Sequence, residues 1–101
     1  QARKLRDLIT EEVNDAFENV DIIATPTTPD VAFKFGEKSD PVSMYLEDIF
    51  TVPYNLTGHP AISIPSGTNS EDMPFGMHFT APLFCEQKLF EVSKDFERAI
   101  L

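Results

Sequence analysis

The sequence predicts an α/β fold in which strands of a mixed sheet are flanked by helices, and three observations lead to this prediction. Apolar residues recur at spacings of three and four near both ends of the chain, as in amphipathic helices. Short apolar and β-branched runs bounded by proline lie between them, as in buried strands. The 101 residues are 42% apolar and 25% charged, which is the composition and length of one small globular domain.

The first half of the chain is expected to form one helix, one strand and a long loop. An apolar stripe at helical spacing predicts the helix over residues 1–20. Asp21–Thr25 is predicted to be a short buried strand, which Pro26 stops. The segment Thr25–Pro29 then places three threonine hydroxyls at the end of that strand, a position that often lines sites in α/β sheets, although a plain loop is the alternative. Val31–Asp40 is predicted to be an irregular loop.

A second helix is predicted to begin at Asp40 and Pro41. Aspartate can cap a helix, and proline suits its first position. The helix is expected to run to about Phe50 and, because it is rich in apolar residues, to be well buried. After an interruption by Pro53, the segment Tyr54–Thr57 is expected to add one further turn.

The last third of the chain predicts an antiparallel hairpin and a closing helix. Pro60–Pro65 and Phe75–Phe79 alternate as strands do, and Ser66–Met73 is a polar turn between them. Helical spacing resumes from Glu86. The predicted strands carry more apolar surface than this chain can cover, so they are expected to belong to a larger sheet. These apolar strand residues are Ile22, Ile23, Ile62, Ile64, Phe75, Met77 and Phe79.

Charge and composition argue against several classes of partner. Eight Lys and Arg against seventeen Asp and Glu give a net charge of −9, which disfavours direct binding to nucleic acid or to anionic membranes. No apolar run approaches the roughly 20 residues that span a bilayer. Cys85 is the only cysteine, so an internal disulfide and a multi-cysteine zinc site are both excluded. That usage is typical of a reducing compartment.

The residues themselves indicate no catalytic group, metal site or cofactor site. His59 and His78 fall on different predicted elements, and each is expected to be a hydrogen-bonded structural histidine. Cys85 is followed by Glu86 with no cation adjacent, which favours an unreactive thiol. No serine lies in a nucleophile elbow. From composition and pattern alone, the chain is an acidic α/β piece without an assigned function.

One stretch of sequence resembles a known family. Met44–Pro53 followed by Tyr54–Pro65 resembles the C-terminal region of amidase signature enzymes, most of all the glutaminase (A) subunits of glutamyl-tRNA(Gln) amidotransferases. Thr25–Pro29, Asp40-Pro41 and Pro74–Met77 match further landmarks in order. The resemblance covers nearly the whole chain but only the last portion of family members. Residues 1–101 are therefore expected to be the C-terminal segment of a single amidase-signature domain within a longer protein.

The resemblance implies that the intact protein is active and that this chain alone is not. Family members use a lysine and two serines in a glycine- and serine-rich signature, and no Gly-Gly-Ser-Ser-Gly stretch occurs here. The intact protein is expected to attack the side-chain amide of glutamine with a serine and to release ammonia. A B subunit then uses the ammonia to amidate activated glutamyl-tRNA(Gln), and a C subunit completes the complex. The implied location is cytoplasmic, or mitochondrial in a eukaryote, and no cofactor is implied.

The resemblance also assigns one substrate-binding residue, Asp48. It aligns with the aspartate of the family's Met-Tyr-x-x-Asp pattern, which contacts the α-amino group of glutamine. A carboxylate held among Met44, Ile49 and Phe50 needs a cationic partner, and a free amino acid brings an ammonium group. The alternative is an ordinary surface carboxylate.

Two other functions remain open at this stage. The chain could come from an amidase-signature hydrolase of small amides that has no tRNA partner. It could also be a non-catalytic acidic interaction module that only shares ancestry with the family.

Overall fold

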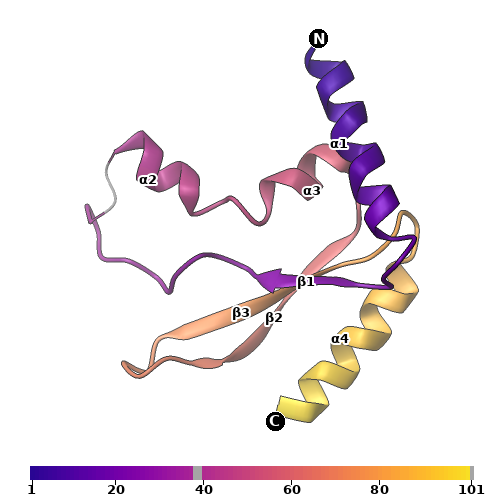
Figure 1. The fold of residues 1–101 in the computed structure, drawn as a ribbon. Helices are drawn as coiled ribbons and strands as arrows, with labels where there is room; N and C mark the ends of the chain where they lie inside the picture. The colour runs from indigo at the N-terminus through magenta and orange to yellow at the C-terminus, as the bar shows by residue number, and fades with distance from the viewer. Residues whose placement is uncertain (38–39, 101) are drawn as a thin grey trace.

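The computed structural model describes residues 1–37 and 40–100, so residues 38–39 of the predicted loop lie outside the described residues. Four helices and three strands follow one another along the chain (Figure 1). Their bounds are α1 (Ala2–Ala16), β1 (Ile23–Pro26), α2 (Pro41–Leu46), α3 (Val52–Thr57), β2 (Ala61–Thr68), β3 (Pro74–Thr80) and α4 (Glu86–Ile100). The predicted α/β class and the order of the predicted elements are confirmed.

The three strands form one sheet in the order β1-β3-β2. Thr80 of the central strand β3 lies opposite Ile23 of β1 on one side and Ala61 of β2 on the other. The predicted hairpin is therefore present. The prediction of a mixed sheet does not hold for the three described strands. β1 and β2 both pair with β3, and both run antiparallel to it.

The two faces of the sheet differ in what covers them. Alternation along β2 and β3 sends Ile64 and Phe79 to the face that packs against α4, where they meet Leu89 and Phe96. The rings of Phe79 and Phe96 pack edge to face, with centroids 5.2 Å apart.

The opposite face of the sheet carries His78, and the ring of Tyr54 in α3 stacks on it. The apolar core is thus confined to the α4 side.

Several predicted boundaries are corrected by the structure. α1 ends at Ala16 rather than near residue 20, and turns follow it. β1 is half-buried and exposed in alternation rather than buried throughout. β2 continues past Pro65 to Thr68, with a bulge between Pro65 and Gly67. Proline is tolerated there because β2 is an edge strand within the described sheet, where the missing N–H breaks no ladder bond.

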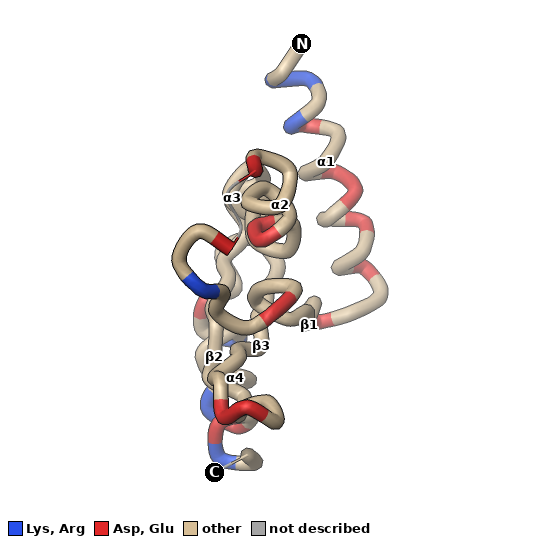
Figure 2. The backbone as a smooth tube through the Cα atoms, turned by 90° about the vertical axis from the view of Figure 1, so that its left-hand side faces the viewer, with Lys and Arg blue, Asp and Glu red and all other residues tan. Residues whose placement is uncertain are grey.

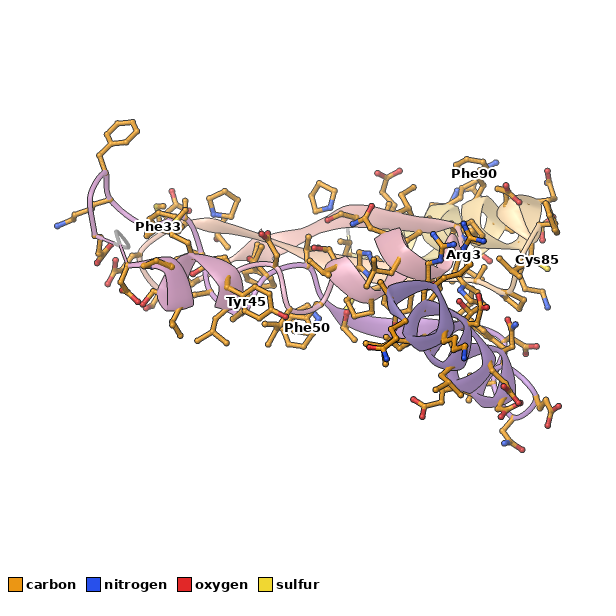
Figure 3. The ribbon with its side chains drawn as sticks, turned by 90° about the horizontal axis from the view of Figure 1, so that it is seen from above. Arg3, Phe33, Tyr45, Phe50, Cys85 and Phe90 are labelled. Atoms are coloured by element: carbon orange, nitrogen blue, oxygen red, sulfur yellow. The ribbon has the colours of Figure 1, made fainter. Side chains whose placement is uncertain are left out.

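The predicted helix over residues 41–50 is wrong in both extent and burial. α2 stops at Leu46, residues 47–51 form turns, and α3 starts anew at Val52. Met44 and Leu46 keep 44% and 49% of their surface exposed. Seen from above, the molecule is a thin slab in which Tyr45 lies at one surface and Phe90 at the other (Figure 3). The apolar side chains of α2 therefore stay largely open to solvent within the described part of the chain.

The purified 101-residue chain is expected to bind a hydrophobic dye and to unfold without a sharp transition. Its radius of gyration is 15.3 Å, whereas a compact domain of this length has about 13 Å. The extra exposed apolar surface on α2 and on the sheet is a binding surface for the dye. Dye fluorescence and a thermal melt followed by circular dichroism measure both properties. A monomer with a cooperative melt and no dye binding contradicts this expectation.

Candidate functional site

Asp48 lies in the turn between α2 and α3, not on a helix as its sequence context predicted. Its N–H donates to the carbonyl oxygen of Tyr45 at 3.1 Å, and its own carbonyl accepts from the N–H groups of Thr51 and Val52 at 3.1 and 3.0 Å. Its side chain is exposed, and Met44 beside it is exposed as well. The described residues therefore do not enclose the carboxylate, and its role in substrate binding stays a prediction.

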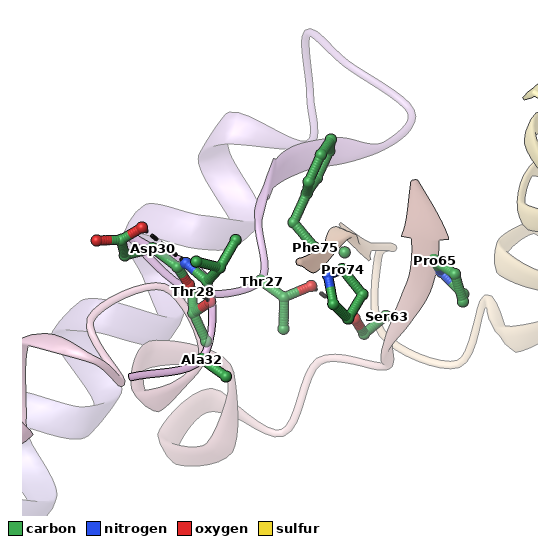
Figure 4. A pocket seen from close by; sticks show the side chains of 10 residues that line it. Thr27, Thr28, Asp30, Ala32, Ser63, Pro65, Pro74 and Phe75 are labelled. Carbon is green, nitrogen blue, oxygen red and sulfur yellow. Dashed lines mark hydrogen bonds between the residues drawn. The ribbon is translucent and has the colours of Figure 1, made fainter. Parts of the chain in front are cut away.

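A cavity of about 320 Å³ lies at the end of β1, and Thr27 and Thr28 of the Thr25–Pro29 segment form part of its lining (Figure 4). Thr27 and Ser63 both line the cavity, and their hydroxyl oxygens share a hydrogen bond of 2.5 Å. When two hydroxyls share one hydrogen bond, one hydrogen and several lone pairs remain for another partner. The pair can thus offer one donor and some acceptors to a polar group that enters the cavity. Its lining residues are Thr27, Thr28, Asp30, Val31, Ala32, Ser63, Pro65, Pro74, Phe75 and Gly76.

Gly76 of β3 leaves the space that this hydroxyl pair occupies. A Cβ atom built at Gly76 comes within 2.8 Å of Ser63 Oγ and 2.9 Å of Thr27 Oγ1. The carbonyl oxygen of Gly76 also accepts a hydrogen bond from the N–H of Thr27 at 3.1 Å. A residue without a side chain is therefore required here by close approach rather than by backbone conformation.

Replacing Gly76 with Ala is expected to destabilise the full-length protein by about 1–3 kcal/mol, because the added methyl group overpacks the hydroxyl pair. The measurement is the free energy of unfolding in denaturant. Ser63→Ala in the same background removes one of the two crowded oxygens, so the double variant is expected to regain part of the loss. If the double variant is destabilised by the full sum of the single effects, this steric explanation is wrong.

His59 is a structural histidine, as predicted. It is 5% exposed, its Nε2 lies 2.8 Å from Asn14 Oδ1, and its Nδ1 lies 2.6 Å from Thr57 Oγ1. Since the amide oxygen only accepts, Nε2 carries the proton and Nδ1 accepts from the threonine hydroxyl. The ring also stacks on Phe17, with centroids 5.6 Å apart. His59 thereby ties α1 to the loop before β2.

His78 differs from that prediction because its hydrogen bonding is incomplete. It is 6% exposed, and its Nδ1 has no hydrogen-bond partner within residues 1–37 and 40–100. Its ring instead stacks on that of Tyr54, with centroids 5.6 Å apart. Tyr54, His59 and His78 share the lining of a second, more polar cavity of about 330 Å³.

Acidification is expected to destabilise the full-length protein below pH about 6.5, in part through these histidines. Burial lowers the pKa of His59 and of His78 below the ordinary 6.5. Between the lowered pKa and 6.5 the unfolded chain binds more protons, so stability falls as pH falls through this window and then levels off. Melting temperatures measured from pH 7 to 5 should show a shallower decline in His59→Gln, which keeps an N–H for Asn14. An identical decline in both proteins contradicts this expectation.

Other kinds of site find no support in the part of the chain that is described. Residues 1–37 and 40–100 hold no cluster of three or more His, Cys, Asp or Glu arranged for a metal ion. Cys85 is a half-buried free thiol. Among these same residues no helix is long and apolar enough to cross a bilayer. Figure 2 shows Lys and Arg in the first turns of α1 and again along α4, while Asp and Glu are spread along most of the molecule.

Sequence reasoning selected Asp48 but did not select the trio of Thr27, Ser63 and Gly76. The proline-rich segment drew attention to Thr27, whereas nothing local marks Ser63, which is 36 residues away. Only the pairing of β2 with β3 and the position of the loop after β1 bring these residues together.

Comparison with known proteins places this segment among amidases. The family model described as "Amidase" matches residues 1–90. The glutamyl-tRNA(Gln) amidotransferase A subunit of Halothermothrix orenii is 43% identical over 99% of the chain and 21% of the relative. The A subunits of Trichodesmium erythraeum and Pelagibacter ubique are each 48% identical, over 98% and 99% of the chain. The chain thus spans about a fifth of the length of the curated relatives it matches.

Solved structures agree with the sequence relatives. The crystal structure of the glutamyl-tRNA(Gln) amidotransferase A subunit from Thermotoga maritima matches 94% of the chain and 21% of that protein, with a TM-score of 0.89 and 42% identity. A 6-aminohexanoate cyclic dimer hydrolase matches 94% of the chain and 23% of the hydrolase, with a TM-score of 0.82 and 28% identity. The chain therefore belongs to the amidase signature family.

Proposed function

We propose that this chain is the C-terminal part of a glutamine-hydrolysing amidase subunit that supplies ammonia for converting Glu-tRNA(Gln) to Gln-tRNA(Gln). The observation that carries the proposal is identity of 43–48% to A subunits along almost the whole chain. The TM-score of 0.89 to the Thermotoga maritima protein supports it. The partners in this function are the B and C subunits, and its location is the cytoplasm, or the mitochondrion of a eukaryote.

In this function the chain contributes to substrate recognition rather than to bond cleavage. A serine elsewhere in the full-length protein attacks the amide carbon of glutamine, ammonia leaves, and water then releases glutamate from the acyl-enzyme. Asp48 accepts hydrogen bonds from the α-ammonium group of glutamine, and the opposite charges make these bonds strong. The exposed position of Asp48 in the turn leaves its carboxylate accessible to the rest of the protein and to substrate.

The test is the substrate preference of the full-length protein that carries this segment. Purified with its B and C subunits, it is expected to release ammonia from glutamine far faster than from butyramide. The likeness to 6-aminohexanoate cyclic dimer hydrolase makes a hydrolase of small amides the second candidate. Faster turnover of butyramide than of glutamine, without any dependence on partner subunits, favours that candidate and overturns the proposal.

A further inference from the structure

We propose that Tyr54 and His78 are positioning residues that hold the turn carrying Asp48 for recognition of the substrate ammonium group. The inference rests on the proposed function, and it extends that function from one contact residue to the stack that supports it. Three links connect the stack to Asp48: the turn is bound to α3, α3 is anchored on the sheet, and the anchor lies in a buried polar layer.

The first link joins the turn to the start of α3. The carbonyl oxygen of Asp48 accepts hydrogen bonds from the N–H groups of Thr51 and Val52 and from the hydroxyl of Thr51, the last at 3.3 Å. Three donors on one carbonyl fix the main chain of Asp48 relative to the first residues of α3. A shift of α3 therefore carries the main chain of Asp48, and with it the origin of its side chain, along.

The second link joins α3 to the sheet. A helix of six residues is too short to be stable by itself and depends on tertiary contacts. Tyr54 lies in the middle of α3, and its ring stacks on His78 of β3 with an interplanar angle of 26°. α1 packs against α3 from the side, but the stack is where α3 meets the central strand. The Tyr54–His78 stack is thus one of the contacts that hold α3, and it is the one on the side of the central strand.

The third link is the polar layer in which His78 lies. The side-chain oxygen of Thr25 and the Nδ1 atom of His78 are both buried without a hydrogen-bond partner in the described ranges. The register places Thr25 directly opposite His78, so these groups share one face of the sheet. Buried polar groups without partners cost stability, and apolar residues in their place would pack at no such cost. The stack on Tyr54 gives the side chain at this position a role besides stability.

Charge at this position is also suited to the role. Burial lowers the pKa of His78, so the ring is neutral at neutral pH. A neutral ring supports the stack without the cost of burying a charge. The stack can then act on Asp48 only through the position of α3.

The experiment compares variants of the full-length protein on glutamine and on glutaramate, which is glutamine without its α-amino group. Tyr54→Leu is expected to raise KM for glutamine roughly three- to tenfold, the range of a lost aromatic pair, with little change in kcat. Tyr54→Phe keeps the ring and removes only the hydroxyl beside Thr80, and it is expected to leave KM close to the wild-type value. Phe90→Leu, an aromatic replacement on exposed α4, is the matched control and is expected to change neither constant.

Combining Tyr54→Leu with Asp48→Asn tests whether the stack acts through Asp48. If the stack acts through Asp48, Tyr54→Leu adds little to the loss that Asp48→Asn already causes. Fully additive losses, or equal losses on glutaramate, overturn the positioning role while leaving Asp48 in place. A normal glutamine KM in Asp48→Asn alone overturns the binding role of Asp48 and the positioning role with it. Circular dichroism reports that each variant is folded, and His78→Leu provides a second break of the same stack.

Discussion

Replacing Asp48 with Asn in the full-length protein is expected to lower kcat/KM for glutamine roughly ten- to a hundredfold. The substitution keeps the shape of the side chain and removes its charge. A hydrogen bond between charged groups contributes about 1.5–3 kcal/mol, and this amount is lost when the ammonium of glutamine meets a neutral amide. The main-chain bonds that hold the turn use the Asp48 carbonyl and N–H, so the substitution leaves them intact. Steady-state ammonia release gives the two constants.

The controls for this prediction are a second substrate and a second carboxylate. Glutaramate lacks the ammonium group, so its kcat/KM is expected to change little in the same variant. Asp95→Asn changes an exposed carboxylate on α4, far along the chain from the turn, and is expected to have no effect. Equal losses for both substrates mean that Asp48 supports the fold or the nucleophile. An unchanged KM and kcat for glutamine show that Asp48 is an ordinary surface carboxylate.

Elements whose pattern and packing partner lie in the same part of the chain could be predicted from the sequence. Alternation of Phe75, Met77 and Phe79 predicted β3, and helical spacing from Leu89 to Phe96 predicted α4. In the structure most of these side chains form or border the apolar core. For β3 and α4 the local apolar pattern matches the tertiary contacts within this chain, so both elements could be predicted from the pattern alone.

Prediction failed where a partner surface was assumed. The apolar residues of 41–50 suggested a buried helix, yet Met44 and Leu46 are exposed in the described chain. The turn at residues 47–51 was also missed, because Ile49 and Phe50 add apolar residues to it like those of α2. Only Pro53 marked a break, and it lies in the first turn of α3 rather than at the end of α2.

The residues of the candidate site were likewise predictable where they lie in one short motif, and not where they are far apart in the sequence. Asp48 was found from a motif of neighbouring residues, whereas the bond between His59 and Asn14 spans 45 positions. The contact between Thr27 and Ser63 also depends on how three strands are ordered. Spacing in the sequence does not encode strand order, so these contacts could be known only from the structure.

The 101-residue chain alone is expected to release no ammonia from glutamine, even at high protein concentration. Hydrolysis needs a nucleophile paired with a base. Ser63 and His78 are opposite each other in the strand register, but Ser63 Oγ hydrogen-bonds with Thr27 and His78 Nδ1 has no partner in the described ranges. The described residues therefore provide a serine and an imidazole side by side without the hydrogen bond that activates a hydroxyl. A coupled glutamate dehydrogenase assay measures ammonia directly.

The full-length protein at equal molar concentration is the positive control for this assay. Ser63→Ala in the isolated chain identifies the source of any activity, because Ser63 is the one serine that the register places opposite a histidine in the described sheet. Ammonia release that disappears in Ser63→Ala contradicts the prediction and assigns a nucleophile to β2. Release that survives in this variant and is absent from a mock purification without the chain also contradicts the prediction, and assigns the activity to another group of the chain.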